Sequence, residues 1–208
     1  MIHYHSQQIE IYANQVAKSG NPLCGDSYFI YETTDYFICV LADGLGSGEL
    51  ANESADAVIA AVVENHHEDV DELMRLSNES LQHKRGAAVA IMKVYLERQE
   101  FEYSCVGNIR FYLYTETGKL TYPLPVRGFL SGRAQKYRTQ RFVYESNCKF
   151  IVHSDGLNLM NVKSLLSKDK LASMRISLKK SRCNQMMIVR LSLVACFNHR
   201  RLFLVVSF

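Results

Sequence analysis

Tryptophan is absent from this 208-residue chain, proline occurs only three times, and no CxxC spacing joins any of its six cysteines. With so few prolines, the chain has no proline-rich linker that would separate two domains. Its length also favours a single domain. Several cysteines, such as Cys39 and Cys105, stand inside apolar runs. Buried free thiols of a cytosolic protein are therefore favoured over a disulfide framework, which stays the alternative. The hydrophobic fraction of 48% against 22% charged residues excludes a disordered chain.

Long apolar segments are also missing. Residues 1–6 contain no apolar stretch of the kind that a secretory signal needs. The longest apolar stretch near the end, Leu191 to Phe197, is interrupted by residues 198–201 and is far shorter than the about 20 residues that span a bilayer. We therefore expect a cytoplasmic protein with no membrane partner.

The net charge of +3 hides a division along the chain. Residues 1–159 hold 14 basic and 20 acidic side chains, whereas residues 160–208 hold ten basic residues and a single acid, Asp169. A nucleic-acid-binding protein is expected to carry positive charge on its folded body. The acidic body therefore argues against nucleic acid as a partner.

Hydrophobic spacing predicts two consecutive helices between strands, which indicates an α+β layered domain. Residues 49–64 repeat apolar side chains at the helical period. Residues 69–82 follow as a second helix, with acids in its first turn. The seven histidines form no ligand pair typical of zinc, and His66 and His67, at the end of the first helix, are expected to be solvated.

Alternation is clearest at residues 100–105, where Phe101, Tyr103 and Cys105 share one face. This pattern predicts a half-buried strand that continues into an antiparallel meander. Denser apolar runs predict central strands that lie between two layers. The meander is expected to use residues 109–113 and 119–122, and the central strands residues 36–42 and 149–153.

Three short motifs place an aspartate beside a glycine at the expected end of a strand: Gly25-Asp26-Ser27, Ala42-Asp43-Gly44 and Ser154-Asp155-Gly156. Asp43 and Asp155 each follow an apolar strand, so we expect their carboxylates to project from the ends of neighbouring strands into a shared opening. Carboxylate and carbonyl oxygens suit hard cations such as Mg²⁺ or Mn²⁺. Any single Asp-Gly pair is more often a plain turn. The specificity lies in the combination and its order.

In this order the motifs resemble those of the PPM-type metal-dependent serine/threonine protein phosphatases, in the bacterial branch that includes the sporulation phosphatase SpoIIE. Two further segments fit the same order. Residues 85–90 resemble the family's small-residue strand, and residues 105–110 resemble its Val-Gly-(Asp/Asn)-x-Arg strand end. Other segments are most similar to the member that resets the sigma-B stress-signalling complex, namely residues 24–27, 42–52 and 122–125. The resemblance covers roughly residues 8–160.

The resemblance implies a fold and a metal site. The fold would be α+β, an αββα four-layer sandwich of two antiparallel sheets flanked by helices. Two ions, Mn²⁺ or Mg²⁺, would be bridged by Asp43, with the Gly44 carbonyl on one ion and Asp155 on the other. Asp26 would hold water that binds an ion. The ions would clamp the phosphate and lower the pKa of an attacking water, with no covalent enzyme intermediate.

The resemblance also implies the substrates. They would be phosphoserine or phosphothreonine in stressosome proteins of the RsbS and RsbR type, which makes the protein a negative regulator of sigma-B. The sequence gives no indication of the oligomeric state or of which ion serves in the cell.

Two positions depart from the family pattern. Many members have an arginine where this chain has Asn21, and some have a histidine where it has Leu45. Phosphate binding and leaving-group protonation would then rest on the ions and on solvent. Arg85 or Arg110 could compensate, although each is also typical of an ordinary surface or strand-end charge.

The C-terminal segment lacks a carboxylate that the family usually supplies from an Asp-Asp pair, because no acid follows Asp169. Met186-Met187-Ile188 stands near the expected position. Methionine has the single codon ATG and every isoleucine codon begins with AT, so reading one base earlier gives GAT-GAT, which encodes Asp-Asp. We infer a shift of reading frame between roughly residues 160 and 184. An in-frame basic tail that docks a partner or a membrane through its charge is the alternative.

These observations predict a phosphatase domain over residues 1–165 and an aberrant, out-of-frame basic tail over residues 166–208. The missing carboxylate also favours a second hypothesis from another class. In it, the chain is a catalytically inactive phosphatase-like module that binds phosphoprotein partners without turnover.

Overall fold

The computed structural model describes residues 2–6, 9–15, 23–145, 147–154, 162–167 and 185–191. The described residues fall into two compact units. Those of the first unit lie within residues 1–16, 110–123 and 144–197, and those of the second lie within residues 17–109 and 124–143.

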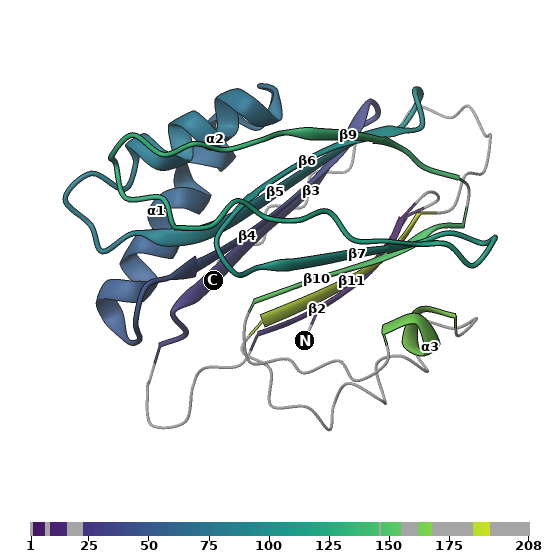
Figure 1. The fold of residues 1–208 in the computed structure, drawn as a ribbon, viewed down its shortest axis with the longest axis horizontal. Coiled ribbons are helices and arrows are strands. Elements are labelled where there is room, and N and C mark those ends of the chain that lie inside the picture. The colour runs from purple at the N-terminus through teal and green to yellow at the C-terminus, as the bar shows by residue number, and fades with distance from the viewer. Residues whose placement is uncertain are drawn as a thin grey trace. The chain divides into compact units, whose positions relative to one another are not determined.

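The second unit is a five-stranded antiparallel sheet with two helices packed on one face (Figure 1). The strand order is β3-β4-β5-β6-β9. The helices are α1 (Glu49–Asn65) and α2 (Val70–Glu79). The strands are β3 (Asp26–Glu32), β4 (Tyr36–Gly44), β5 (Ala87–Tyr95), β6 (Glu100–Val106) and β9 (Gln140–Val143).

The two helices expected over residues 49–64 and 69–82 are confirmed as α1 and α2. The side chain of Asp69 accepts a hydrogen bond from the backbone N–H of Glu72 (2.8 Å), which satisfies one of the unpaired donors in the first turn of α2. The apolar stripes of both helices form one core with side chains of β3, β4 and β5. Their buried members are Ala55, Val58, Val62, Val70, Leu73 and Met74.

β6 is buried on both faces, although its sequence alternates. The face that the sequence predicts to be exposed carries Glu102, which is 6% exposed, and Ser104, which is fully buried. These residues pair in register with Lys93 and Ile91, on the side of the sheet that the helices cover. The prediction of a half-buried strand is therefore wrong, because alternation along one strand cannot reveal a helix that covers its polar side.

The first unit is a six-stranded antiparallel sheet with the order β1-β2-β11-β10-β7-β8. β4 and β10 each have a strand on either side, which confirms both as central strands. The elements are β1 (Ile2–His5), β2 (Ile9–Gln15), β7 (Arg110–Tyr114), β8 (Leu120–Thr121), β10 (Lys149–His153), α3 (Val162–Leu166) and β11 (Gln185–Leu191).

No helix in the described part of the chain is both long and apolar enough to cross a membrane.

The expected meander is only partly correct, because β6 and β7 belong to different sheets. β7 and β8 do pair as an antiparallel hairpin around Thr117-Gly118. β6 pairs instead with β5 and β9. The chain leaves β6 at Gly107, whose φ of +122° favours glycine. A Cβ there would lie 2.3 Å from the Cβ of Ala88, so no side chain fits.

β11 lies inside the segment that the sequence predicts to be a tail. It pairs with β2 on one side and with β10 on the other. Met186 is in register with His153, and Met187 with Val152. Residues 185–191 therefore form a strand as they are written, while the domain boundary at residue 165 and the shift of reading frame stay predictions.

The four cysteines in the described part of the chain are thiols outside any disulfide. Cys39, Cys105 and Cys148 are buried, and Cys24 is half-buried. Burial raises the pKa of the Cys105 and Cys148 thiols to about 12, so both stay protonated near neutral pH. The expectation of buried free thiols is therefore confirmed for three cysteines. Two others lie outside the described residues, namely Cys183 and Cys196.

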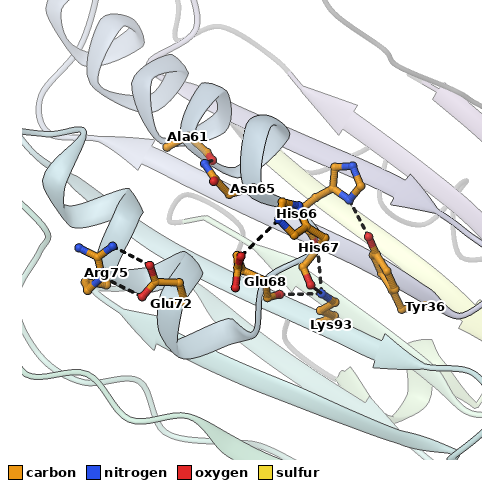
Figure 2. Close-up of polar contacts among 9 residues, drawn as sticks. All are labelled: Tyr36, Ala61, Asn65, His66, His67, Glu68, Glu72, Arg75 and Lys93. Carbon is orange, nitrogen blue, oxygen red and sulfur yellow. Dashed lines mark hydrogen bonds and ion pairs between the residues drawn. The ribbon is translucent and has the colours of Figure 1, made fainter.

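Lys93 is buried on the helix-covered face of β5, with 2% of its surface exposed. Its ammonium group donates hydrogen bonds to the carbonyl oxygens of His66, His67 and Glu68, at 3.0, 2.9 and 2.6 Å (Figure 2). It also lies 4.1 Å from the centre of the Tyr36 ring. His66 is the C-cap of α1, and the other two carbonyls lie in the link to α2. Carbonyls at a helix end lack partners within the helix, and a cation there also interacts favourably with the helix dipole. Lys93 therefore fixes the end of α1 onto the sheet.

The expectation that both histidines at this helix end are solvated is correct for His67 only. The side chain of His67 is 65% exposed and lies 3.3 Å from Glu68. Nδ1 of His66 shares a hydrogen bond with the hydroxyl of Tyr36, at 2.6 Å (Figure 2). Burial, and secondarily the charges of His67 and Lys93, lower the pKa of His66. The neutral form of His66 is therefore favoured in the folded protein.

Replacing Lys93 by Met should lower the free energy of unfolding by about 2 kcal/mol, because three carbonyl oxygens lose a charged donor. The control is Lys84→Met, which removes a surface ion pair with Glu53 and should change stability by less than about 0.5 kcal/mol. Urea denaturation followed by circular dichroism measures both. Equal effects of the two substitutions would contradict the role of Lys93.

Candidate metal site

Asp26 and Asp43 lie directly opposite one another at the end of the β3–β4 pair. Paired residues in an antiparallel sheet have Cα atoms about 4.5–5.5 Å apart and side chains on the same face. That face is the one away from the helices, because the neighbouring Ala42 belongs to the helix-side core. Asp26 is 3% exposed and Asp43 is half-buried. Two carboxylates are thus brought together at the end of one strand pair.

The backbone at Gly44 has no space for a side chain, because α1 touches it. A Cβ on Gly44 would lie 1.9 Å from the carbonyl oxygen of Ala51. The N–H of Gly44 donates to the carbonyl of Gly25, and the N–H of Leu45 donates to the carbonyl of Gly86, each at 3.0 Å. The peptide on each side of Gly44, including the one that carries its carbonyl, is therefore held by a hydrogen bond directly after Asp43.

The donors described at this strand end are hard oxygen ligands. They are the two facing carboxylates and the carbonyl oxygen of a fixed glycine peptide. Mg²⁺ and Mn²⁺ prefer such ligands over nitrogen or sulfur. The residues present therefore fit a divalent cation of this kind. Within the described part of the chain, however, no group of three or more His, Cys, Asp or Glu side chains is placed to hold a metal.

Asp155, the third predicted carboxylate, lies outside the described residues, as does Asn21. The strand before Asp155 is β10, in the six-stranded sheet, whereas Asp43 belongs to β4 in the five-stranded sheet. The expectation that Asp43 and Asp155 follow neighbouring strands is therefore wrong. Sequence spacing identifies the end of a strand but does not show to which sheet the strand belongs. The role of Asp155 as a metal ligand stays a prediction.

Of the two arginines considered for phosphate binding, Arg85 lies beside the Asp43 loop within the second unit. Its Nη1 lies 2.9 Å from the position that a Cβ on Gly46 would take, and the residue is exposed. Arg110 belongs to the first unit, where its guanidinium donates to the hydroxyl of Tyr122 at 3.0 Å. The contact with the Asp43 loop therefore favours Arg85 as the residue to test first.

Asp56 contacts the strand that carries Asp26 from the helix-covered face of the sheet, a contact that the sequence did not predict. Asp56 lies in α1 and accepts a hydrogen bond from the hydroxyl of Ser27, the residue after Asp26. It stands off the apolar stripe of the helix, where a solvated acid is the usual interpretation. The only available signal was its position in the second turn of a helix that begins directly after the Asp-Gly loop.

Comparison with known proteins gives close relatives. The chain is 44% identical over 164 residues to the phosphoserine phosphatase RsbX of Bacillus subtilis (strain 168), covering 78% of this chain and 82% of that protein. A crystal structure of RsbX in complex with magnesium matches with a TM-score of 0.88 and 38% identity, over 92% of this chain and 99% of that chain. The serine/threonine phosphatase PstP/Ppp of Mycobacterium tuberculosis matches in fold alone, with a TM-score of 0.67 and 15% identity, over 89% of this chain and 99% of that chain. No protein-family model matches the chain.

The fold is that of the PP2C-type, or PPM-type, protein phosphatases. The expected α+β class, with antiparallel sheets and helices, is confirmed. Within that class the chain belongs to the RsbX family. The resemblance carried by the Asp-Gly motifs is thereby confirmed as well.

Replacing Gly44 by Ala should lower the free energy of unfolding by about 3 kcal/mol, because the new methyl group meets a backbone oxygen that cannot move alone. The matched control is Gly25→Ala, whose Cβ would lie 3.2 Å from the Cβ of Ala51, a contact that a small shift relieves. The control should cost less than about 1 kcal/mol. Thermal unfolding measures both variants. A control that loses as much as Gly44→Ala would argue against the close approach of α1.

Proposed function

We propose that the chain is a divalent-metal-dependent protein phosphatase acting on phosphoserine or phosphothreonine. The observation that carries the proposal is the pairing of Asp26 with Asp43 at the end of β3 and β4, in a member of the RsbX family. By likeness to RsbX, its substrates are phosphorylated stressosome proteins of the RsbS and RsbR type. It then acts in the cytoplasm as a negative regulator of the sigma-B stress response.

In the proposal, three groups of this chain are metal ligands and one carboxylate binds water. Asp43, the Gly44 carbonyl and Asp155 would hold the divalent ions, Mn²⁺ or Mg²⁺. Asp26 accepts hydrogen bonds from water at the site. Divalent ions, when bound, supply positive charge that neutralises the phosphate and lowers the pKa of an attacking water. The magnesium in the RsbX crystal structure supports this choice of ion.

Arg85 binds the phosphate of the substrate in this proposal. Its guanidinium lies against Gly46, two residues beyond the Asp43-Gly44 pair. A guanidinium presents paired N–H donors that match two phosphate oxygens. Leu45 has no proton to give, so the leaving oxygen takes its proton from solvent.

A second candidate, an inactive module that binds phosphorylated partners, is favoured by the lack of any acid after Asp169. β11 brings Met186 and Met187, rather than carboxylates, into register with the end of β10. Fewer charged ligands weaken divalent-ion binding. A Mn²⁺ titration with a phosphopeptide separates the candidates, since any turnover by this polypeptide excludes the inactive module. Turnover that appears only with a frame-corrected C-terminus would support the shift of reading frame.

Replacing Asp43 by Asn keeps the size of the side chain and removes its charge. We expect phosphopeptide hydrolysis to fall by more than about 100-fold, and the rise in melting temperature on adding Mn²⁺ or Mg²⁺ to disappear. The control is Glu116→Gln, an exposed acid in the β7–β8 turn, which should alter neither quantity. Full activity of the Asp43→Asn variant would refute the proposed metal site.

Replacing Arg85 by Gln should raise KM for a phosphopeptide about 10-fold, because one charge-assisted interaction with the phosphate is lost. Arg85→Lys should recover part of this loss, since the charge returns without the paired donors. Arg98→Gln is the matched control, because Arg98 is exposed in the turn at the opposite end of β5. Steady-state kinetics measures KM for each variant. An equal rise of KM in the Arg98→Gln control would contradict the proposed role of Arg85 in phosphate binding.

A further inference from the structure

The connection between β8 and β9 contains a basic loop, which we define as residues 124–139. It carries four basic side chains and no acid, whereas the rest of residues 1–159 carries ten basic and twenty acidic side chains. All four cations are exposed. Loops of this length without secondary structure are uncommon in compact domains and usually serve a function. The four basic residues are Arg127, Arg133, Lys136 and Arg138.

The basic loop is anchored along its length rather than left free. Leu130 exchanges two backbone hydrogen bonds with Ala87, both at 2.9 Å. The N–H of Val126 donates to the carbonyl of Cys105 at 2.8 Å. The side chain of Asn78, in α2, accepts from the N–H groups of residues 131 and 132 and donates to the carbonyl of residue 133, at 3.1, 3.2 and 2.8 Å. A partner would therefore meet these cations already positioned, which lowers the entropy cost of binding.

The loop lies at the end of the sheet that carries the candidate metal site. Gly44 is in register with Ala87, and Ala87 forms a bridge with Leu130, so the three stand in one row. Two strand spacings separate the backbone of Gly44 from that of Leu130, about 10 Å. The ring of Phe129 packs on Gly86, where a Cβ would lie 2.9 Å from its Cδ2. A partner held by the loop would therefore stand next to the Asp43 loop.

Few carboxylates of the protein itself are paired with the positive charges of the loop. None of its four cations forms an ion pair within the described part of the chain, and the nearby Glu102 is paired with Arg141 of β9, at 2.8 Å. At the end of the loop that leads into β9, Asp71 of α2 accepts a hydrogen bond from Thr139 at 2.6 Å. Three of the four cations precede this end of the loop in the sequence, namely Arg127, Arg133 and Lys136.

We propose that the basic loop is the docking surface for an acidic face of the phosphoprotein substrate. The cations attract that face, and Phe129, which is 44% exposed, offers an apolar contact at the edge nearest the site. The loop thereby selects phosphosites that have acidic residues nearby in the folded substrate. This inference rests on the proposed phosphatase function, because it assigns the loop to the substrate of that site.

The test uses two phosphoserine peptides of equal length, one with four glutamates beside the phosphoserine and one with four glutamines. The full-length protein should hydrolyse the acidic peptide with a kcat/KM about 10-fold higher at low salt, and the preference should vanish near 0.5 M salt. The triple variant R127Q/R133Q/K136Q should lose the preference, mainly through KM. It should keep its rate on p-nitrophenyl phosphate, a small ester that cannot reach the loop.

The matched control is R98Q/K119Q/K163Q, which removes three exposed cations outside the loop. It should keep the preference for the acidic peptide. An equal loss in the control, or no preference in the unmodified protein, would overturn the docking surface. Tighter binding of an oligonucleotide or of phosphatidylserine vesicles than of the acidic peptide would overturn it as well, because the loop would then be a general polyanion site.

Binding of the same labelled peptides, followed by fluorescence anisotropy, separates this inference from the proposed function. If no peptide or small ester is hydrolysed but the acidic peptide still binds through the loop, the phosphatase function fails and the docking surface stands. If the small ester is hydrolysed and the triple variant binds both peptides as the unmodified protein does, the function stands and the docking surface is refuted.

Discussion

The close approach of α1 to the end of β4 is the constraint on which the second unit depends. Only glycine fits at position 44, because the carbonyl oxygen of Ala51 occupies the place that a side chain would take. This contact sets the first turn of the helix on the strand that carries Asp43, and the register of β3 then sets Asp26 opposite. Lys93 fixes the other end of the same helix. A backbone contact at one end of the helix and a buried lysine side chain at the other therefore hold the helix against the strand that carries Asp43.

That acidic pair is unfavourable taken alone, since like charges directly opposite one another on a sheet repel. Such local conflicts with stability are expected where a site serves function, and a bound cation relieves them. The guanidinium of Arg85 lies beside Gly46, in the Asp43 loop. The basic loop follows on the other side of β5, where Leu130 pairs with Ala87. Negative and positive groups are thus arranged in sequence along one end of the sheet. The overall charge of +3 describes none of this arrangement.

Patterns in the sequence predicted the features that depend on residues close together in the chain. They failed for burial and strand pairing, which depend on contacts between distant segments. The apolar stripe of residues 49–64 predicted α1, and the Asp-Gly motifs predicted the strand-end carboxylates of Asp26 and Asp43, because both signals come from residues close together in the sequence. The exposure of Glu102 was predicted wrongly, since α2 covers a face that the strand's own residues mark as polar. The meander failed at Gly107, where the chain leaves one sheet for the other. The place of Arg85 beside Gly46 depends on a tertiary contact that no spacing encodes.

The position of β11 has a consequence for how the chain folds during synthesis. The five-stranded sheet and its two helices use residues 26–143, so they can assemble as soon as that stretch has left the ribosome. The six-stranded sheet cannot, because β2, among the first residues made, has β11 as the neighbour that joins it to β10. Strands β1 and β2 must wait with an unpaired edge until residues 185–191 emerge, and unpaired edges invite association between chains. The pairing of β11 with β2 and β10 therefore closes that edge and ends this period of exposure.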